Sequence, residues 1–201
     1  LGILPDVTRA NPSGFTEEGL AVILLGTTRK EFDGSAWARI ARSHLGGLPP
    51  EVDLKAEVAL GNVVRALSAA DGPDGRPLVR AAHDLSNGGL LQSLVDSALR
   101  FGIGGVFDVA GAARRDSVGD HEMLLSESQA RAFVAVPEVA VKAVFAAAEA
   151  EGVDAIRIGT TGGDMLAISG VDLLAAEGEG CGWIASIDEL RELSDTGRKY
   201  F

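Results

Sequence analysis

The stretch AAHDLSNGGLLQSL, residues 81–94, combines residue types that could bind a ligand. An apolar run ends at His83 and Asp84, and two glycines separate it from a helical pattern of leucines. A carboxylate at the end of a strand, followed by a glycine turn and the start of a helix, lies beside free backbone amides and the positive end of the helix dipole. Phosphates and magnesium bind at such places, because a carboxylate offers oxygen to a hard cation and glycine lets the backbone approach closely.

The same residues also fit a turn with no ligand. Ser86 or Asn87 could cap the helix, Gly88 and Gly89 could supply positive φ, and the carboxylate of Asp84 could accept hydrogen bonds from backbone amides. Taken alone, the local motif favours this structural interpretation, because short motifs often occur without the function. The ligand-binding alternative stays open.

A second candidate is LLSESQAR, residues 124–131. Glu127, Ser128 and Gln129 place a carboxylate, a hydroxyl and an amide between apolar residues, which is a composition typical of a binding loop. These groups could contact the hydroxyls and amides of a polar ligand, or they could form a turn that faces water.

Other chemistries lack support in the sequence. The glycines at 102–105 do not have the GxGxxG spacing, and no GxxxxGK is present, so neither common nucleotide-binding loop is indicated. The histidines His44, His83 and His121 are far apart in the sequence, and the single Cys181 has no second cysteine with which to share a metal. No nucleophilic triad can be argued from these residues.

Composition and charge narrow the class of protein. The chain has 201 residues, 46% of them hydrophobic, which is enough for a folded core. A net charge of −11 would repel a phosphate backbone, so nucleic acid is not expected as a partner. The apolar runs are too short to span a bilayer, and we expect a cytoplasmic protein with no membrane contact.

The order of hydrophobic patterns predicts an α+β fold, a mixed β-sheet with packed helices. We expect helices after the N-caps Ser35 and Asp53, after Gly89, after Pro137, and after the Ser186–Glu189 capping box. The stretch 110–123 shows no clear period and is expected to be a connection. The strands are expected at residues 20–25, 79–83, 105–109, 130–136, 155–159 and 165–169.

Five segments together carry a resemblance to a known family. They are LLGTTRKEFDGSAWA, GGLPPEVDLKAE, AAHDLSNGGL, LLSESQARAFVAV and IGTTGGDML, in this order along nearly the whole chain. The chain resembles the C-terminal domain of the second half of phosphoribosylformylglycinamidine synthases, the PurL family. Aminoimidazole ribonucleotide synthetases and selenophosphate synthetases share the glycine turn but not the PPEVDL stretch.

The resemblance implies a place in a larger enzyme. The intact ligase would join formylglycinamide ribonucleotide, ATP and glutamine-derived ammonia to give the amidine of de novo purine biosynthesis. Residues 1–19 would be the end of a preceding domain or a linker, and residues 20–201 a domain like that of aminoimidazole ribonucleotide synthetase. The chain begins LGILPDV, without methionine and with the pattern of a buried strand, so we expect a fragment of a longer protein.

By the same resemblance, the catalytic histidines, the ATP-binding lysine and most magnesium ligands would lie upstream. ATP and Mg²⁺ would serve the intact enzyme, with none certain for this chain, which we expect to be inactive alone. Its partners would be the rest of the PurL chain, a glutaminase subunit and a small accessory subunit. The alternative is a free-standing module of the same fold that binds its own ligand or partner.

The family also implies roles for the two candidate stretches. By analogy with the first half of these enzymes, Asp84 corresponds to a magnesium-binding aspartate, and the segment 127–129 to a substrate-contacting loop. Asn87 stands where the family often has aspartate and Ala130 where it usually has glycine, so the resemblance implies a pseudo-site and not a reaction centre. The expected pseudo-site, at one end of the sheet, comprises Asp84, Ser86, Asn87, Gly88, Gly89, Glu127, Ser128 and Gln129.

Overall fold

The computed structural model describes residues 6–170 and 182–197. Within them, seven strands form one sheet in the order β2-β4-β1-β5-β3-β6-β7. Neighbouring strands are antiparallel except β3 and β6, which are parallel. The strands are β1 (Ala21–Leu25), β2 (Ala81–Asp84), β3 (Gly105–Asp108), β4 (Ala132–Val136), β5 (Ala155–Thr161), β6 (Met165–Ser169) and β7 (Gly182–Ser186).

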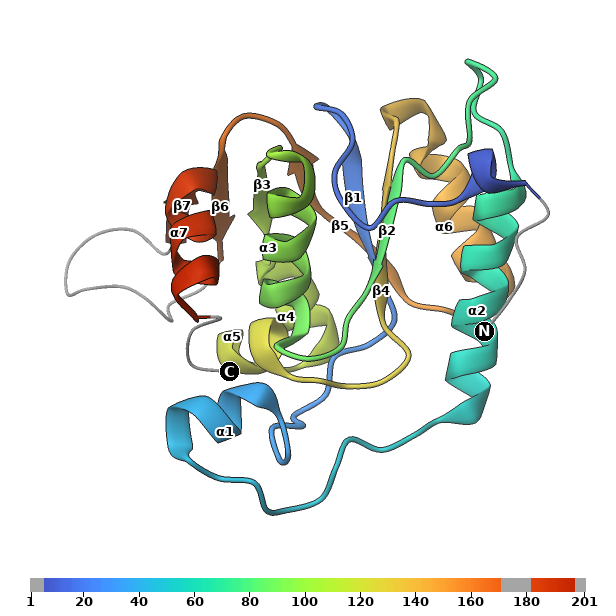
Figure 1. The fold of residues 1–201 in the computed structure, drawn as a ribbon. Helices are drawn as coiled ribbons and strands as arrows, with labels where there is room; N and C mark the ends of the chain where they lie inside the picture. The colour runs from blue at the N-terminus through green and yellow to red at the C-terminus, as the bar shows by residue number, and fades with distance from the viewer. Residues whose placement is uncertain (1–5, 171–181, 198–201) are drawn as a thin grey trace.

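Helices cover both faces of the sheet (Figure 1). Helices α3, α4, α5 and α7 pack on one face, whereas α2 and α6 pack on the other. The short α1 lies beyond one end of the strands. The helices are α1 (Ala36–Arg42), α2 (Leu54–Ala69), α3 (Gly89–Phe101), α4 (Ala110–Asp116), α5 (Asp120–Leu125), α6 (Val141–Ala150) and α7 (Ile187–Gly197), with 3₁₀ turns η1 (Val7–Arg9) and η2 (Glu138–Ala140).

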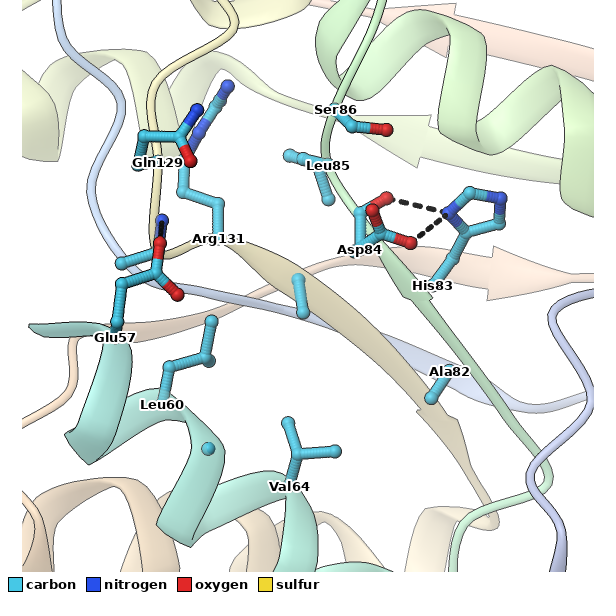
Figure 2. Close-up of a pocket in the computed structure, with 13 residues that line it drawn as sticks. Glu57, Leu60, Val64, Ala82, His83, Asp84, Leu85, Ser86, Gln129 and Arg131 are labelled. Atoms are coloured by element: carbon cyan, nitrogen blue, oxygen red, sulfur yellow. Dashed lines mark hydrogen bonds and ion pairs between the residues drawn. The ribbon is translucent and has the colours of Figure 1, made fainter. Parts of the chain in front are cut away.

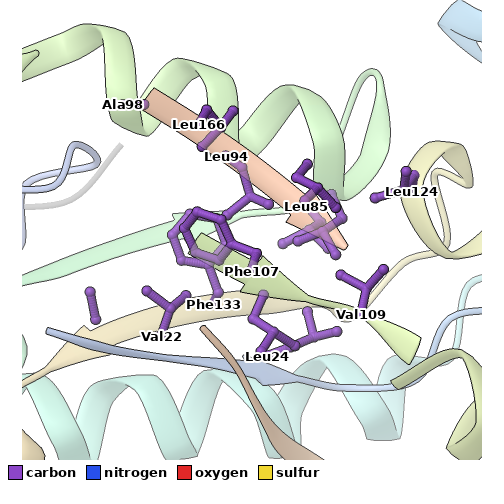
Figure 3. Close-up of a cluster of buried hydrophobic side chains, with 14 of the residues drawn as sticks. Val22, Leu24, Leu85, Leu94, Ala98, Phe107, Val109, Leu124, Phe133 and Leu166 are labelled. Atoms are coloured by element: carbon purple, nitrogen blue, oxygen red, sulfur yellow. The ribbon is translucent and has the colours of Figure 1, made fainter. Parts of the chain in front are cut away.

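The central strand β1 is buried on both faces because each face has its own core. Val22 and Leu24 point into the larger core, whereas Ile23 and Leu25 point toward α2 and α6. Since side chains alternate along a strand, a strand covered on both faces must be apolar at every position, as AVILL is. Figure 3 shows Phe107 and Phe133 in the larger core. Phe15 packs on both of their rings, with centroids 6.0 and 5.9 Å away.

The predicted α+β class and mixed sheet are confirmed. Ser35 caps α1 by accepting from the amide of Ala38, and Asp53 caps α2 through two amides. The capping box before α7 also forms, because Glu189 accepts from the amide of Ser186 while the Ser186 hydroxyl accepts from the amide of Glu189. Among the described helices, none combines the length and hydrophobicity needed to cross a bilayer.

The stretch 110–123 was wrongly expected to be a connection, because it contains α4 and most of α5. Each helix has seven residues or fewer, too few for an apolar period to repeat. Strand β7 was not predicted either. The expected strand at residues 1–4 and Cys181 lie outside the described residues. The domain boundary at residue 19 stays a prediction, although Phe15 already packs in the core.

Candidate functional site

The two candidate stretches lie side by side at one end of the sheet. Strand β2 pairs with β4 so that Asp84 faces Ala132, which brings the turn after β2 next to the segment before β4. Between these strands and α2 is a pocket of about 420 Å³ (Figure 2). It is lined by Glu57, Leu60, Gly61, Val64, Ala82, His83, Asp84, Leu85, Ser86, Gln129, Ala130, Arg131 and Ala132.

Glu127 occupies the position where an anion would be expected. Its Oε1 accepts hydrogen bonds of 2.8 Å from the amide of Gly88, at the start of α3, and from the amide of Ala36, at the start of α1. A helix start attracts negative charge because its first amides have no partner within the helix. Here the protein supplies that charge itself, so one carboxylate joins two helix starts and the 126–131 segment.

Ser86 and Asn87, expected as alternative caps, do not cap α3. The N-cap is Gly88, at φ 76°, and no side chain at this position makes a capping hydrogen bond. Gly89 follows at φ 64°, and a Cβ there would lie 2.6 Å from the carbonyl oxygen of Ser126. Positive φ at both glycines, and close packing of Gly89 against the end of α5 and Ser126, explain these residues without a bound ligand.

Asp84 does not make the turn hydrogen bonds that were expected of its carboxylate. The side chain is 78% exposed, and its contact is with Nδ1 of His83 at 3.7 Å. The backbone oxygen of Asp84 is the bonded group, since it accepts from the Ser93 hydroxyl at 3.0 Å. In residues 6–170 and 182–197, no group of three His, Cys, Asp or Glu side chains is placed to hold a metal ion. The metal-binding role expected of Asp84 stays a prediction.

Ser128 and Gln129 have different roles in the segment before β4. The buried hydroxyl of Ser128 accepts from the amide of Arg29 at 2.9 Å, so it bonds to the backbone of the protein. Gln129 is exposed and lines the pocket (Figure 2). Ala130 has φ 54°, in the left-handed region, and its amide donates to Glu57 of α2 at 2.9 Å. This conformation explains in physical terms why glycine would suit the position better than alanine.

Arg131 is a key residue of this segment that the sequence did not reveal. Its side chain is buried, and it donates to the carbonyl oxygens of Ser126 and Ser128 and to the hydroxyl of Thr28. Burial lowers the pKa of the guanidinium to about 10, against the raising effect of the Asp116 and Glu31 carboxylates, so it stays charged at neutral pH. These three bonds hold the segment before β4 to the body of the protein.

Asp116 was also missed, because it lies in the stretch expected to be a connection. Its side chain is only 1% exposed, and it accepts from the amide of Thr28 at 2.8 Å. Arg115 donates to it at 2.6 Å. The pocket and its surroundings therefore contain acidic groups bound to backbone amides and a cation bound to carbonyls. Nucleotide binding at the expected pseudo-site stays a prediction.

Comparison with known proteins identifies the family. Residues 17–169 match the family described as AIR synthase related protein, C-terminal domain. The chain belongs to this family. It is 43% identical to the phosphoribosylformylglycinamidine synthase subunit PurL of Renibacterium salmoninarum over 100% of its own length and 24% of that protein. It is 45% identical to PurL of Leifsonia xyli subsp. xyli over 80% of its length and 20% of that protein.

Solved structures of the family show the same fold. The chain matches Thermotoga maritima PurL complexed with ATP, with a TM-score of 0.65 and 18% identity, over 90% of this chain and 27% of that one. It matches the PurLQS structure from T. maritima with a TM-score of 0.66 and 16% identity, over the same shares. The expected resemblance to PurL is confirmed, and the chain spans about a quarter of the relatives or less.

Proposed function

We propose that this chain serves as the C-terminal domain of the second half of a phosphoribosylformylglycinamidine synthase of the cytoplasm. The intact enzyme would join formylglycinamide ribonucleotide, ATP and ammonia from glutamine to form the amidine. Support comes from the family match over residues 17–169 and from the 43% identity to a PurL subunit along the whole chain. The rest of the polypeptide, a glutaminase subunit and a small accessory subunit would be its partners, and the fold is similar to that in the structure of PurLQS from T. maritima.

Within that enzyme, the chain would act as a scaffold that carries a pseudo-site. The observation that supports this role is the Glu127 carboxylate, which already binds the amides of Gly88 and Ala36. A phosphate at the start of α3 would have to displace a negative charge held by two hydrogen bonds of 2.8 Å. ATP and Mg²⁺ would therefore act in the intact enzyme at groups that other parts of the polypeptide supply.

A chimera tests the proposed function directly. The matching segment of R. salmoninarum PurL is replaced by this chain, and the product is assayed with formylglycinamide ribonucleotide, ATP and ammonium ion for release of ADP and amidine. We expect the chimera to be active and the isolated chain to be inactive, because the catalytic groups lie elsewhere. A folded chimera without activity, or turnover by the isolated chain, would contradict the proposal.

The pseudo-site is tested separately in the same chimera. Asp84→Ala should leave kcat/KM within about twofold, as should the control Asp96→Ala on the exposed side of α3, because neither carboxylate would touch the reacting atoms. Calorimetric titration of the isolated chain with ADP and magnesium should give a Kd of about 1 mM or weaker. Tight ADP binding that Asp84→Ala abolishes without changing the melting temperature would show a working site instead.

A further inference from the structure

Large apolar side chains are exposed along one continuous part of the chain, residues 40–58. Of the thirteen large hydrophobic residues exposed in the described structure, six lie in this segment. Exposed apolar residues are normal when scattered singly, but a concentration of them marks an interaction surface. We call the six residues the apolar strip; they are Ile40, Leu45, Leu48, Val52, Leu54 and Val58, each at least 61% exposed.

The segment that carries the apolar strip is attached to the body of the protein by its other side chains and by backbone hydrogen bonds. On α1, Trp37 faces the body of the protein, with its ring 4.9 Å from Phe32 and 6.3 Å from His121. Residues 43–53, between α1 and α2, form no regular element. The amides of Leu48 and Glu51 hold them to the protein through bonds to the carboxylates of Asp33 and Glu31. These hydrogen bonds fix the backbone of the segment, whereas the side chains of the apolar strip belong to neither core.

The strip lies at the end of the sheet that carries the pocket. Figure 1 shows α1 and the following segment passing beyond that end of the strands and joining the start of α2. On α2, Glu57 and Leu60 line the pocket, while Leu54 and Val58 belong to the strip. A partner seated on the strip would therefore also lie at the rim of the pocket, beside Glu57.

Charge narrows the chemistry of the partner. The whole chain has a net charge of −11, yet residues 29–58 contain five basic and five acidic residues. This part of an acidic protein is electrically balanced and apolar, so it suits another protein surface rather than a strongly charged ligand.

We propose that the apolar strip is the surface by which this domain docks onto the remainder of its synthase polypeptide. The inference rests on the proposed function, because the occupant is the part of the relatives that this chain does not match, and the chain covers only 24% and 20% of two of them. Domain interfaces within one polypeptide bury apolar surface of this kind. Docking there would cover six large side chains and bring the neighbouring domain to the mouth of the pocket.

Hydrogen exchange read by mass spectrometry tests the surface without depending on activity. Amide exchange is compared between the isolated chain and the chimera with R. salmoninarum PurL described above. We expect residues 43–58 to exchange at least about tenfold more slowly in the chimera, because a docked domain excludes water from the backbone that carries the strip. Helix α6, which carries no residue of the apolar strip, should exchange at the same rate in the isolated chain and in the chimera.

Paired variants assign the protection to the strip. In the chimera, Leu45→Ser with Leu48→Ser should restore fast exchange in residues 43–58, whereas Val139→Ser should not, although Val139 and Leu45 are equally exposed at 72%. The substituted side chains lie outside both cores, so the domain itself should still fold.

Two other outcomes would overturn the inference. An active chimera with unchanged exchange in residues 43–58 would leave the proposed function standing and remove the docking surface. Protection in the isolated chain that rises with its concentration, together with a dimer in sedimentation, would assign the strip to a second copy. An inactive chimera in which the segment is still protected would instead count against the proposed function alone.

Discussion

Replacing Glu127 should destabilise this protein far more than replacing Asp84. The sequence assigned the turn-stabilising carboxylate to Asp84, but the structure places Glu127 on the amides of Gly88 and Ala36, each at 2.8 Å. Glu127→Ala leaves two amides at helix starts without a partner. An unpaired donor costs roughly 1 to 3 kcal/mol when buried, and Glu127 is half-buried, so the free energy of unfolding should fall by about 2 to 4 kcal/mol.

Two further variants separate charge from hydrogen bonding. Glu127→Gln keeps an oxygen acceptor and loses the charge, so it should cost about 1 to 2 kcal/mol, since bonds to an ionised acceptor are stronger than neutral ones. Asp84→Ala should change the free energy of unfolding by no more than about 0.5 kcal/mol, because that carboxylate is 78% exposed and accepts no backbone amide bond.

Urea unfolding measures all three variants under the same conditions. The slope of the free energy against urea should stay constant, because the surface exposed on unfolding is unchanged. For a protein of this size, about 1 kcal/mol corresponds to roughly 2 to 4 °C in Tm, so Glu127→Ala should melt about 4 to 16 °C lower. The reasoning is refuted if Asp84→Ala costs as much as Glu127→Ala, or if Glu127→Ala costs less than about 1 kcal/mol.

Three other substitutions, and one control on α2, test the segment before β4 and the start of α2. Ala130→Gly should raise the free energy of unfolding by about 0.5 to 1 kcal/mol, because φ is 54° at this position. The control Ala66→Gly, on the exposed face of α2, should lower it by about 1 kcal/mol. If urea unfolding shows that both substitutions lower the free energy of unfolding, Ala130 is not strained. Arg131→Met should cost at least about 3 kcal/mol, because two carbonyls and the Thr28 hydroxyl lose their donor, and a melt close to wild type would contradict this. The amides of α2 keep the pKa of Asp53 below its usual 3.8, so its stabilising effect is present above that value and is lost as pH falls through the lower folded pKa. Asp53→Asn should cap equally well at pH 7 but should remove this part of the acid dependence of stability. Unfolding followed by circular dichroism between about pH 2 and 5 would detect the difference.

The sequence alone predicted those elements whose start is marked by residues close together in the chain. Ser35, Asp53 and the Ser186–Glu189 pair each act on amides within three residues, so their types and spacing alone identified three helix starts. Strand β1 was recognised because a strand buried on both faces is apolar at every position. Helices α4 and α5 were missed because each has seven residues or fewer, and α4 buries only alanines.

The sequence predicted where the two candidate stretches lie but not which residues bond to one another. Both candidate stretches were expected at one end of the sheet, and the pairing of Asp84 with Ala132 brings them there. Which carboxylate reaches which amide depends on positions distant in the chain, since Glu127 is 39 residues from Gly88 and 91 from Ala36. The buried Arg131 was likewise invisible, because an arginine beside a strand gives no sign of whether it turns inward.

The polar groups at this end of the sheet are largely satisfied within the domain, and this has a consequence for its function. Glu127 binds the amides of two helix starts, Glu57 binds the amide of Ala130, and Asp116 binds the amide of Thr28. Three carboxylates from separate elements thus neutralise the amides that would otherwise attract an anion. The same end of the domain carries uncovered apolar surface, the strip along residues 40–58. A domain whose helix-start amides are bonded internally and whose apolar surface is uncovered is suited to hold a neighbour in position, which is the role that the proposed synthase would require of it.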